Sequence, residues 1–157
     1  MKRLDAIKEI MNQINDEIVI TSAGKISREV YFVKDRDKNF YVQGSMGASL
    51  GIGIGIALNT NKKVVVIAGD GEILMSLGSL VLLEKLLKNK KIKLDLYILD
   101  NNQYQSTGGQ KTISNVIDFR CICGYCKVIF CGNSEKEVPR IDIPHKEIKR
   151  RFMNAIC

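Results

Sequence analysis

Two apolar runs, each ending in small or polar residues, most constrain the fold of this chain. The first is VVVIAGDG at 64–71, and the second is the run at 94–99, which is followed by DNN at 100–102. A helically patterned apolar segment, 73–87, lies between them. Buried parallel strands read as continuous apolar runs, and their crossovers are usually helices. The sequence therefore predicts a strand–helix–strand unit of an α/β fold, with both polar clusters at the carboxyl ends of strands.

These two strand ends are candidates for a ligand site, because ligands of open α/β sheets bind at the carboxyl ends of the strands. Asp70 and Asn101 offer the hard oxygen ligands that suit Mg²⁺. Gly69 and Gly71 let a phosphate approach the backbone closely. Glu72 follows Gly71 where a P-loop would continue to Gly-Lys-Ser/Thr, so this is not a P-loop. The residues alone indicate a phosphate- or diphosphate-bearing ligand held together with Mg²⁺.

The apolar patterning extends this unit in both directions. A short β-rich run precedes Gly24 and Ser27, which stand where a helix N-terminus can bind an anion through backbone N–H groups and a hydroxyl. We expect further helices over 4–14, 26–33, 73–87 and 145–156, and strands over 17–21, 63–68, 94–99 and 127–130.

The glycine-rich segment GSMGASLGIGIGIAL, at 44–58, allows two interpretations. Its glycines are too dense for a strand and lack the G-x-G-x-x-G pattern of a dinucleotide fold. In the first interpretation it is a helix packed tightly on the sheet or on a partner, where missing side chains permit close approach. In the second, the turn Gly44-Ser45-Met46-Gly47 shapes a cofactor pocket. The residues alone leave both interpretations open.

Length and composition fit one globular domain spanning residues 1–157. Hydrophobic residues make up 45% of the chain and charged residues 26%, which is ordinary for a soluble protein. The net charge of +7 is concentrated at 88–93 and 146–151, without interleaved aromatics, so we interpret these clusters as solvated faces rather than a nucleic-acid surface. The run at 48–58 is too short to span a bilayer, and residues 1–12 lack the apolar core of a secretory signal. We therefore expect a cytoplasmic protein without nucleic-acid or membrane partners.

Four cysteines are spaced in a way that invites a zinc or iron–sulfur interpretation: Cys121, Cys123, Cys126 and Cys131. We favour buried, reduced thiols that act as small hydrophobic residues, because the last two flank an apolar strand-like run. The spacing alone does not decide between a metal site and a packed core. His145 is the only histidine and is expected at the surface, which leaves no candidate for a histidine-based catalytic triad.

The two strand ends resemble the thiamine diphosphate motif, in which GDG is followed, after a helix-length gap, by N or NN. The surrounding sequence narrows the resemblance. It includes EIVITSAGKISREVYFVKDRDKNFYVQGSMG at 17–47, GDGEILMSLGSL at 69–80, YILDNNQYQSTGGQKT at 97–112 and PHKEIKRRFMNAI at 144–156. Together these segments closely resemble the sulfopyruvate and phosphonopyruvate decarboxylase family, in its diphosphate-binding, beta-type part. The resemblance covers nearly the whole chain.

The resemblance implies a fold and a set of site residues. The fold is a three-layer open α/β sheet, mostly parallel, with helices on both faces and a shortened C-terminal part. Asp70, Asn101 and the backbone carbonyl of Gln103 are implied to hold Mg²⁺, with Met46 beneath the cofactor and the loop 106–110 closing over the substrate. The implied cofactor-binding set is Gly24, Ser27, Gly44, Ser45, Met46, Gly69, Asp70, Gly71, Glu72, Asn101, Gln103 and Tyr104.

The resemblance also implies an activity that depends on thiamine diphosphate and Mg²⁺. The expected reaction is decarboxylation of sulfopyruvate to sulfoacetaldehyde, in coenzyme M biosynthesis. The catalytic glutamate of such enzymes lies on a pyrimidine-binding domain, so we expect none on this chain, and we expect an alpha-type subunit to complete the site in a hetero-oligomer. Phosphonopyruvate or another 2-oxo acid is an alternative substrate. A degenerate, non-catalytic subunit is a further alternative, because the segment between Cys131 and Pro139 is shorter than the family pattern.

Overall fold

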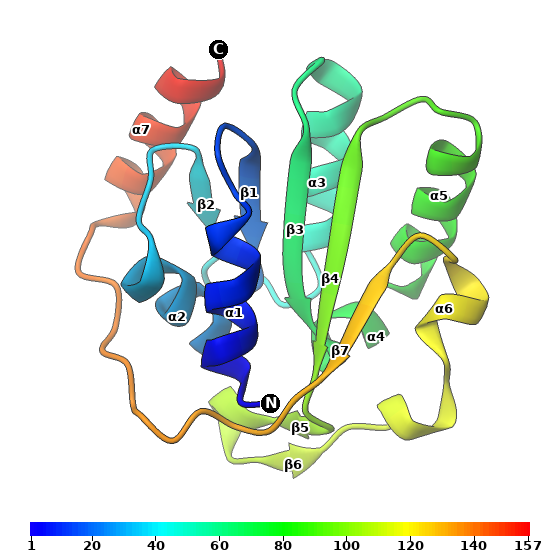
Figure 1. Ribbon diagram of the computed structural model, residues 1–157. Helices are drawn as coiled ribbons and strands as arrows, with labels where there is room; N and C mark the ends of the chain where they lie inside the picture. The colour runs from blue at the N-terminus through cyan, green and yellow to red at the C-terminus, as the bar shows by residue number, and fades with distance from the viewer.

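A five-stranded sheet forms the middle layer of the computed structural model, which describes residues 1–157 (Figure 1). All of its strand pairs are parallel, and the strand order is β2-β1-β3-β4-β7. A separate antiparallel pair, β5 and β6, projects beyond the carboxyl ends of these strands. The strands are β1 (Ile18–Thr21), β2 (Asn39–Tyr41), β3 (Val64–Gly69), β4 (Leu94–Asp100), β5 (Gln103–Tyr104), β6 (Gln110–Lys111) and β7 (Lys127–Phe130).

Helices cover both faces of the sheet, which confirms the predicted three-layer α/β fold. Helices α1 and α2 pack on one face, α3 and α5 pack on the other, and α7 lies beside the edge strand β2. The helices are α1 (Arg3–Asn12), α2 (Lys25–Val33), α3 (Ser49–Asn59), α4 (Asp70–Leu74), α5 (Leu77–Lys88), α6 (Phe119–Ile122) and α7 (His145–Ile156), with 3-10 turns at Gln105–Thr107 and Ser114–Val116. None of these helices is both long and apolar enough to cross a membrane.

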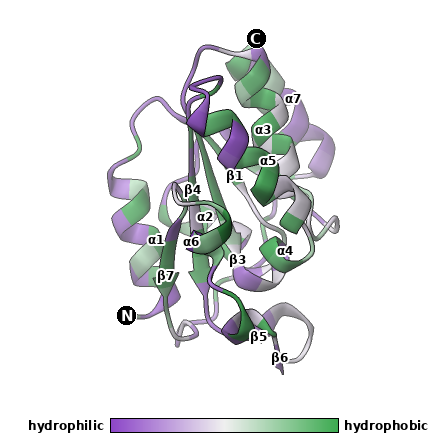
Figure 2. Ribbon diagram, turned by 90° about the vertical axis from the view of Figure 1, so that its right-hand side faces the viewer, coloured by the Kyte–Doolittle hydropathy of each residue, from purple (hydrophilic) through white to green (hydrophobic).

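Successive residues of each central strand point to opposite faces, so the sheet divides the interior into two cores. In β3, Val64 and Val66 pack in the core beneath α3 and α5, whereas Val65 and Ile67 pack in the core beneath α1 and α2. Figure 2 shows the apolar residues of the strands and of α3 concentrated in the interior, and polar residues on the outer side of α1. The continuous apolar runs of the sequence therefore correspond to strands buried on both faces.

The structure divides the helix expected over 73–87. Helix α4 begins earlier, at Asp70, and α5 begins only at Leu77, with Met75 and Ser76 between them. The Ser76 hydroxyl donates to the Glu72 carbonyl oxygen at 3.2 Å, which satisfies an acceptor that a continuous helix would have used. The break lets α4 stay at the end of β3 while α5 runs back along the sheet.

After β7 the chain crosses the carboxyl ends of the strands to reach α7, and we call residues 131–144 the crossing segment (Figure 1, orange). Its first residues pair with the start of the chain. The Arg3 amide donates to the Gly132 carbonyl at 2.9 Å, and the Gly132 amide donates to the Met1 carbonyl at 3.0 Å. β7 is the outermost strand on this side of the sheet, and its residue Phe130 is 65% exposed.

Helix α3 resolves part of the question raised by the glycine-rich segment. A Cβ placed on Gly53 would overlap the Val66 side chain and lie 3.6 Å from Leu94 Cδ1, so this glycine permits close contact between α3 and the sheet. Gly51 and Gly55 lie on the opposite side of the helix, where a Cβ would meet nothing within 4 Å. Close packing on the sheet thus depends on one glycine of the three.

This difference predicts opposite effects for two substitutions in the same helix. Gly53→Ala should destabilise the chain by about 1–3 kcal/mol, because the added methyl group overpacks the core against Val66. Gly55→Ala should stabilise it by about 0.5–1 kcal/mol, because alanine has the higher helix propensity and the site is open. Urea unfolding of the two variants measures both effects. Equal stability of the two would contradict the packing role of Gly53.

Candidate functional site

A cavity of about 660 Å³ lies at the carboxyl ends of β1, β3 and β4. Its walls come from the loop that leads into α2, the turn before α3, the start of α4 and the hairpin after β4, with residues 140, 141 and 145 closing one side. Among the residues predicted to bind a cofactor, those that line the cavity are Gly24, Ser27, Gly44, Met46, Gly69, Asp70, Gly71, Glu72, Asn101, Gln103 and Tyr104. These residues follow neighbouring parallel strands, whose carboxyl ends meet at one edge of the sheet, so the fold brings them together.

Ser45 is the one predicted cofactor residue that does not line the cavity. It is exposed, and its carbonyl oxygen accepts a hydrogen bond from the Ala48 amide at 3.2 Å. Ser45 therefore forms the turn that places Gly44 and Met46 at the cavity, and its own side chain points elsewhere. The turn thus borders a cavity, as the second interpretation of the glycine-rich segment requires, and that this cavity is a cofactor pocket stays a prediction.

Two buried carboxylates stand at the ends of β3 and β4. Asp70 is 1% exposed and Asp100 is 4% exposed, and neither makes an ion pair. Asp70 Oδ2 accepts a hydrogen bond from Thr112 Oγ1 at 2.5 Å, and Asp100 Oδ1 accepts one from Ser114 Oγ at 3.1 Å. Burial, and then the neighbouring charge of Asp70, raise the pKa of Asp100. Asp70, which lines the cavity, thus offers a carboxylate without a basic partner, which a bound cation would balance, whereas Asp100 does not line the cavity.

The oxygen donors beside Asp70 suit a hard divalent cation. Asn101 follows β4 directly and lines the cavity, and its Oδ1 accepts a hydrogen bond from the Gln103 amide at 3.3 Å. The Asp70 carboxylate, the Asn101 amide oxygen and the main-chain carbonyl of Gln103 would be a sparse set of ligands. Mg²⁺ completes such a set with water and phosphate oxygens. The residues present at this point therefore fit a magnesium ion bound together with a phosphate group.

The loop into α2 provides a second group of polar contacts. Gly24 precedes α2 with φ +85°, and a Cβ there would overlap the Ser106 hydroxyl, whose oxygen accepts from the Lys25 amide at 3.3 Å. Ser27 is buried, and its hydroxyl donates to the Ser22 carbonyl at 2.6 Å. Gly24 at the start of this nine-residue helix lines the cavity, whereas the Lys25 amide is engaged by Ser106 and the Ser27 hydroxyl is engaged within the loop.

Gly71, the last residue of GDG, and Glu72, which follows it, have different roles. Glu72 is 3% exposed, and its Oε1 accepts hydrogen bonds from the Ser49 amide at 3.0 Å and the Ser49 hydroxyl at 2.6 Å. Its carboxylate therefore holds the start of α3. A Cβ on Gly71 would lie 2.8 Å from Tyr104 Cδ1 and 3.3 Å from Met46 Cε, so only glycine lets these side chains meet the turn.

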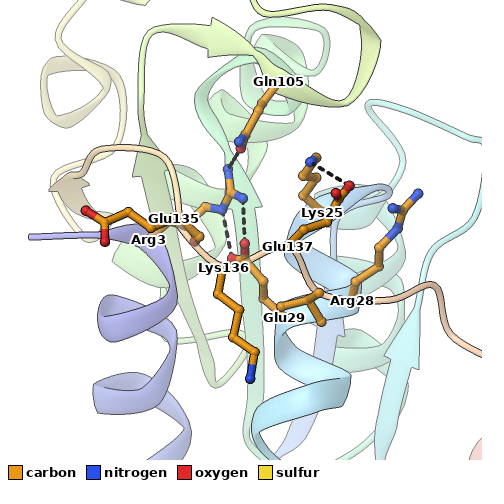
Figure 3. A pocket seen from close by; sticks show the side chains of 10 residues that line it. Arg3, Lys25, Arg28, Glu29, Gln105, Glu135, Lys136 and Glu137 are labelled. Carbon is orange, nitrogen blue, oxygen red and sulfur yellow. Dashed lines mark hydrogen bonds and ion pairs between the residues drawn. The ribbon is translucent and has the colours of Figure 1, made fainter.

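Sequence reasoning missed a buried ion pair beside the cavity, in the adjoining small pocket that Figure 3 shows. Arg3 is 3% exposed and Glu29 is 2% exposed, and the guanidinium makes two hydrogen bonds to the carboxylate, at 2.6 and 2.9 Å. Arg3 Nη1 also donates to Gln105 Oε1 at 2.5 Å. The three residues are far apart in the sequence and belong to no motif, so no local signal could have found them. Their contacts tie the start of α1 to the hairpin that follows Asn101.

The cysteines show no metal-binding arrangement. No three His, Cys, Asp or Glu side chains anywhere in the chain are grouped to hold a metal ion, and all five thiols are free. Cys123 and Cys126 pack in the core beneath α3 and α5, and Cys131 packs in the other core. Burial raises the pKa of the Cys126 and Cys131 thiols to about 11. At neutral pH these thiols are protonated and pack as small apolar groups.

Comparison with known proteins bears on the cavity and the fold. The family model described as thiamine pyrophosphate enzyme, C-terminal TPP binding domain, matches residues 23–119. Sulfopyruvate decarboxylase subunit beta of Methanocaldococcus jannaschii is 38% identical, over 99% of this chain and 97% of that protein. That alignment extends over 185 positions, so the relative carries residues that this chain of 157 lacks. Phosphonopyruvate decarboxylase of Streptomyces viridochromogenes is 39% identical, over 82% of this chain and 33% of that protein.

Solved structures extend the likeness to the fold alone. A putative thiamin diphosphate-dependent enzyme from Mycobacterium smegmatis superposes with a TM-score of 0.61 at 16% identity, over 89% of this chain and 32% of that one. The 2-oxoglutarate:ferredoxin oxidoreductase from Magnetococcus marinus superposes with a TM-score of 0.51 at 20% identity, over 69% of this chain and 36% of that one. The parallel sheet with helices on both faces is thus shared with these larger proteins.

The buried Arg3–Glu29 pair gives a stability test of the cavity rim. Glu29→Leu should destabilise the chain by about 3–5 kcal/mol, because it leaves the Arg3 guanidinium buried without its partner. The double variant Arg3→Met/Glu29→Leu should recover most of this loss, because no charge is then buried at that place. Urea unfolding measures both variants. A double variant as unstable as the single one would mean that packing, rather than charge, dominates at this position.

Proposed function

Because the chain belongs to the sulfopyruvate decarboxylase beta-subunit family of thiamine pyrophosphate enzymes, we propose that it is the diphosphate-binding subunit of a decarboxylase acting on sulfopyruvate. The resemblance found in the sequence is confirmed by the family match and by the relatives that cover nearly the full chain. The product would be sulfoacetaldehyde, in the route to coenzyme M, and the enzyme would act in the cytoplasm.

The observation that carries this proposal is the meeting of Asp70 and Asn101 in one cavity beside the start of α2. In the proposed site, Asp70, the Asn101 amide oxygen and the Gln103 carbonyl hold Mg²⁺. The backbone N–H groups at Gly24 and at the GDG turn bind the diphosphate. When bound, thiamine diphosphate supplies an acceptor for the electron pair released as CO₂ leaves. The chain's own residues anchor, orient and shield that cofactor.

Met46 and Tyr104 are proposed to support the cofactor from below. Both line the cavity, and both approach Gly71 closely, so they form an apolar shelf next to the metal ligands. Met46 is 42% exposed in the isolated chain. A bound cofactor would bury this side chain, and burial of apolar surface would contribute to its affinity.

The charge of the cavity wall supports an anionic cofactor and an anionic substrate. Lys25, Arg28 and Arg140 line the cavity, and neither Arg28 nor Arg140 makes an ion pair within the chain. Figure 3 shows the Arg28 side chain lying apart from the interactions drawn around Arg3 and Lys25. Basic side chains around a cleft attract anions and raise their local concentration. This wall would favour the diphosphate and a 2-oxo acid with a second acidic group.

The cavity also supports the need for a partner. Glu72 is its only glutamate, and the carboxylate of Glu72 is committed to Ser49, so no glutamate is free to act on the cofactor's pyrimidine ring. Met46 and Met75, which is 59% exposed, leave apolar surface uncovered near the cavity. The relatives named subunit beta also point to a second subunit. We therefore propose an alpha-type, pyrimidine-binding subunit that completes the site in a hetero-oligomer.

Phosphonopyruvate is the second candidate substrate, because phosphonopyruvate decarboxylases are also among the relatives. A reconstitution assay separates the candidates. The chain mixed with an alpha-type subunit, thiamine diphosphate and Mg²⁺ should release CO₂ from sulfopyruvate faster than from phosphonopyruvate, and the chain alone should release none. Faster release from phosphonopyruvate would reassign the substrate. Release from neither acid would indicate a non-catalytic subunit, which is the outcome that the shortened crossing segment would favour.

The proposed Mg²⁺ site predicts the effect of removing the Asp70 carboxylate. Asp70→Asn should weaken Mg²⁺-dependent binding of thiamine diphosphate by more than about 100-fold. Losing a residue that only supports a metal ligand costs about 10–100-fold in metal affinity, and losing the ligand itself costs more. Asp5→Asn, at an exposed carboxylate on α1, is the matched control and should leave binding unchanged. Isothermal titration calorimetry measures both. Undiminished binding by Asp70→Asn would show that the metal assignment is wrong.

A further inference from the structure

We propose that Asn133, in the crossing segment, is a positioning residue that fixes the orientation of the metal ligand Asn101. The inference rests on the proposed Mg²⁺ site. Asn133 is half-buried and belongs to no sequence motif described above. Its side chain makes hydrogen bonds to two of the residues assigned to the metal, Asn101 and Gln103. It therefore acts on the metal through its neighbours.

The two hydrogen bonds use opposite ends of the Asn133 amide. Asn101 Nδ2 donates to Asn133 Oδ1 at 2.7 Å, and Asn133 Nδ2 donates to Gln103 Oε1 at 2.9 Å. Because the nitrogen of Asn101 is engaged in this way, its oxygen must face the other side. There Oδ1 accepts from the Gln103 amide at 3.3 Å and keeps a second lone pair for a cation.

The orientation of Asn101 decides whether it can serve as a ligand. The oxygen and nitrogen ends of a carboxamide have nearly the same shape, but only the oxygen binds a cation, whereas the NH₂ group repels one. Without the acceptor at Asn133, rotation about the Asn101 side chain would bring both ends to the metal. A residue that holds the other end of a ligand in this way commonly changes metal affinity by about 10–100-fold.

Asn133 is well placed for this task because its neighbours are fixed. The Cys131 amide donates to the Asp100 carbonyl at 2.8 Å, and Gly132 pairs with the start of the chain. The backbone just before Asn133 is thus held in place, and its side chain can keep one orientation.

A double-variant experiment tests the inference with a readout other than activity. Mn²⁺ replaces Mg²⁺, and electron paramagnetic resonance follows metal binding to the full chain with thiamine diphosphate, alone and mixed with its pyrimidine-binding partner. Asn133→Leu should raise the Mn²⁺ concentration for half-saturation by about 10–100-fold. In the Asn101→Asp background, the same Asn133→Leu change should have less than about a twofold effect, because a carboxylate offers an oxygen at either end.

Ser134→Ala is the matched control in the same segment. It removes the contact with Leu4 but leaves the Asn133 amide in place, so it should lower stability in urea while leaving Mn²⁺ affinity within about twofold of the original chain. An equal loss of affinity from Asn133→Leu in both backgrounds, or no loss in either, would overturn the positioning role. If the original chain binds no Mn²⁺ in any mixture, the proposed metal site itself fails.

Discussion

The parallel pairing of β3 with β4 is the constraint on which the rest of the site depends. Because Gly69 stands opposite Leu99 in the register, both strands end at the same level, and the polar residues that follow begin side by side. This places two carboxylates, Asp70 and Asp100, in a buried position without a basic partner. Hydroxyl groups of Thr112 and Ser114 satisfy some of their oxygens. The fold tolerates this concentration of charge at the point where a cation is expected to bind.

A second group of contacts stabilises that edge from outside the sheet. The start of α1 reaches the hairpin through Arg3 and Gln105, and the crossing segment reaches it through Asn133. Charged and polar groups that are fully paired give a loop a single conformation, at the cost of desolvating them. These polar links hold the hairpin after β4 together with the packing of Tyr104 against Gly71. Rigidity here comes from elements distant in the sequence.

Apolar patterning predicted four of the five strands of the sheet and its long helices, because strands such as β3 are buried on both faces and helices such as α2 on one. It missed the three-residue edge strand β2. The GDG and NN motifs predicted where the cavity forms, because the ends of parallel strands meet. The break between α4 and α5 was not predictable, since it depends on a hydrogen bond from Ser76 within an apolar run. The Arg3–Glu29 pair and the Asn133 contacts join residues 26 or more positions apart, and such contacts leave no periodic signal.

The pairing of Gly132 with Met1 has a consequence for the order in which the protein is built. The Met1 carbonyl and the Arg3 amide acquire their backbone partner, Gly132, only after the crossing segment has been synthesised. Closing so long a loop is slow relative to forming local helices and neighbouring strands. During translation, the β3–β4 core can therefore assemble well before the edge where Asn133 contacts Asn101. The sheet edge where Asn133 contacts Asn101 is therefore completed late in synthesis.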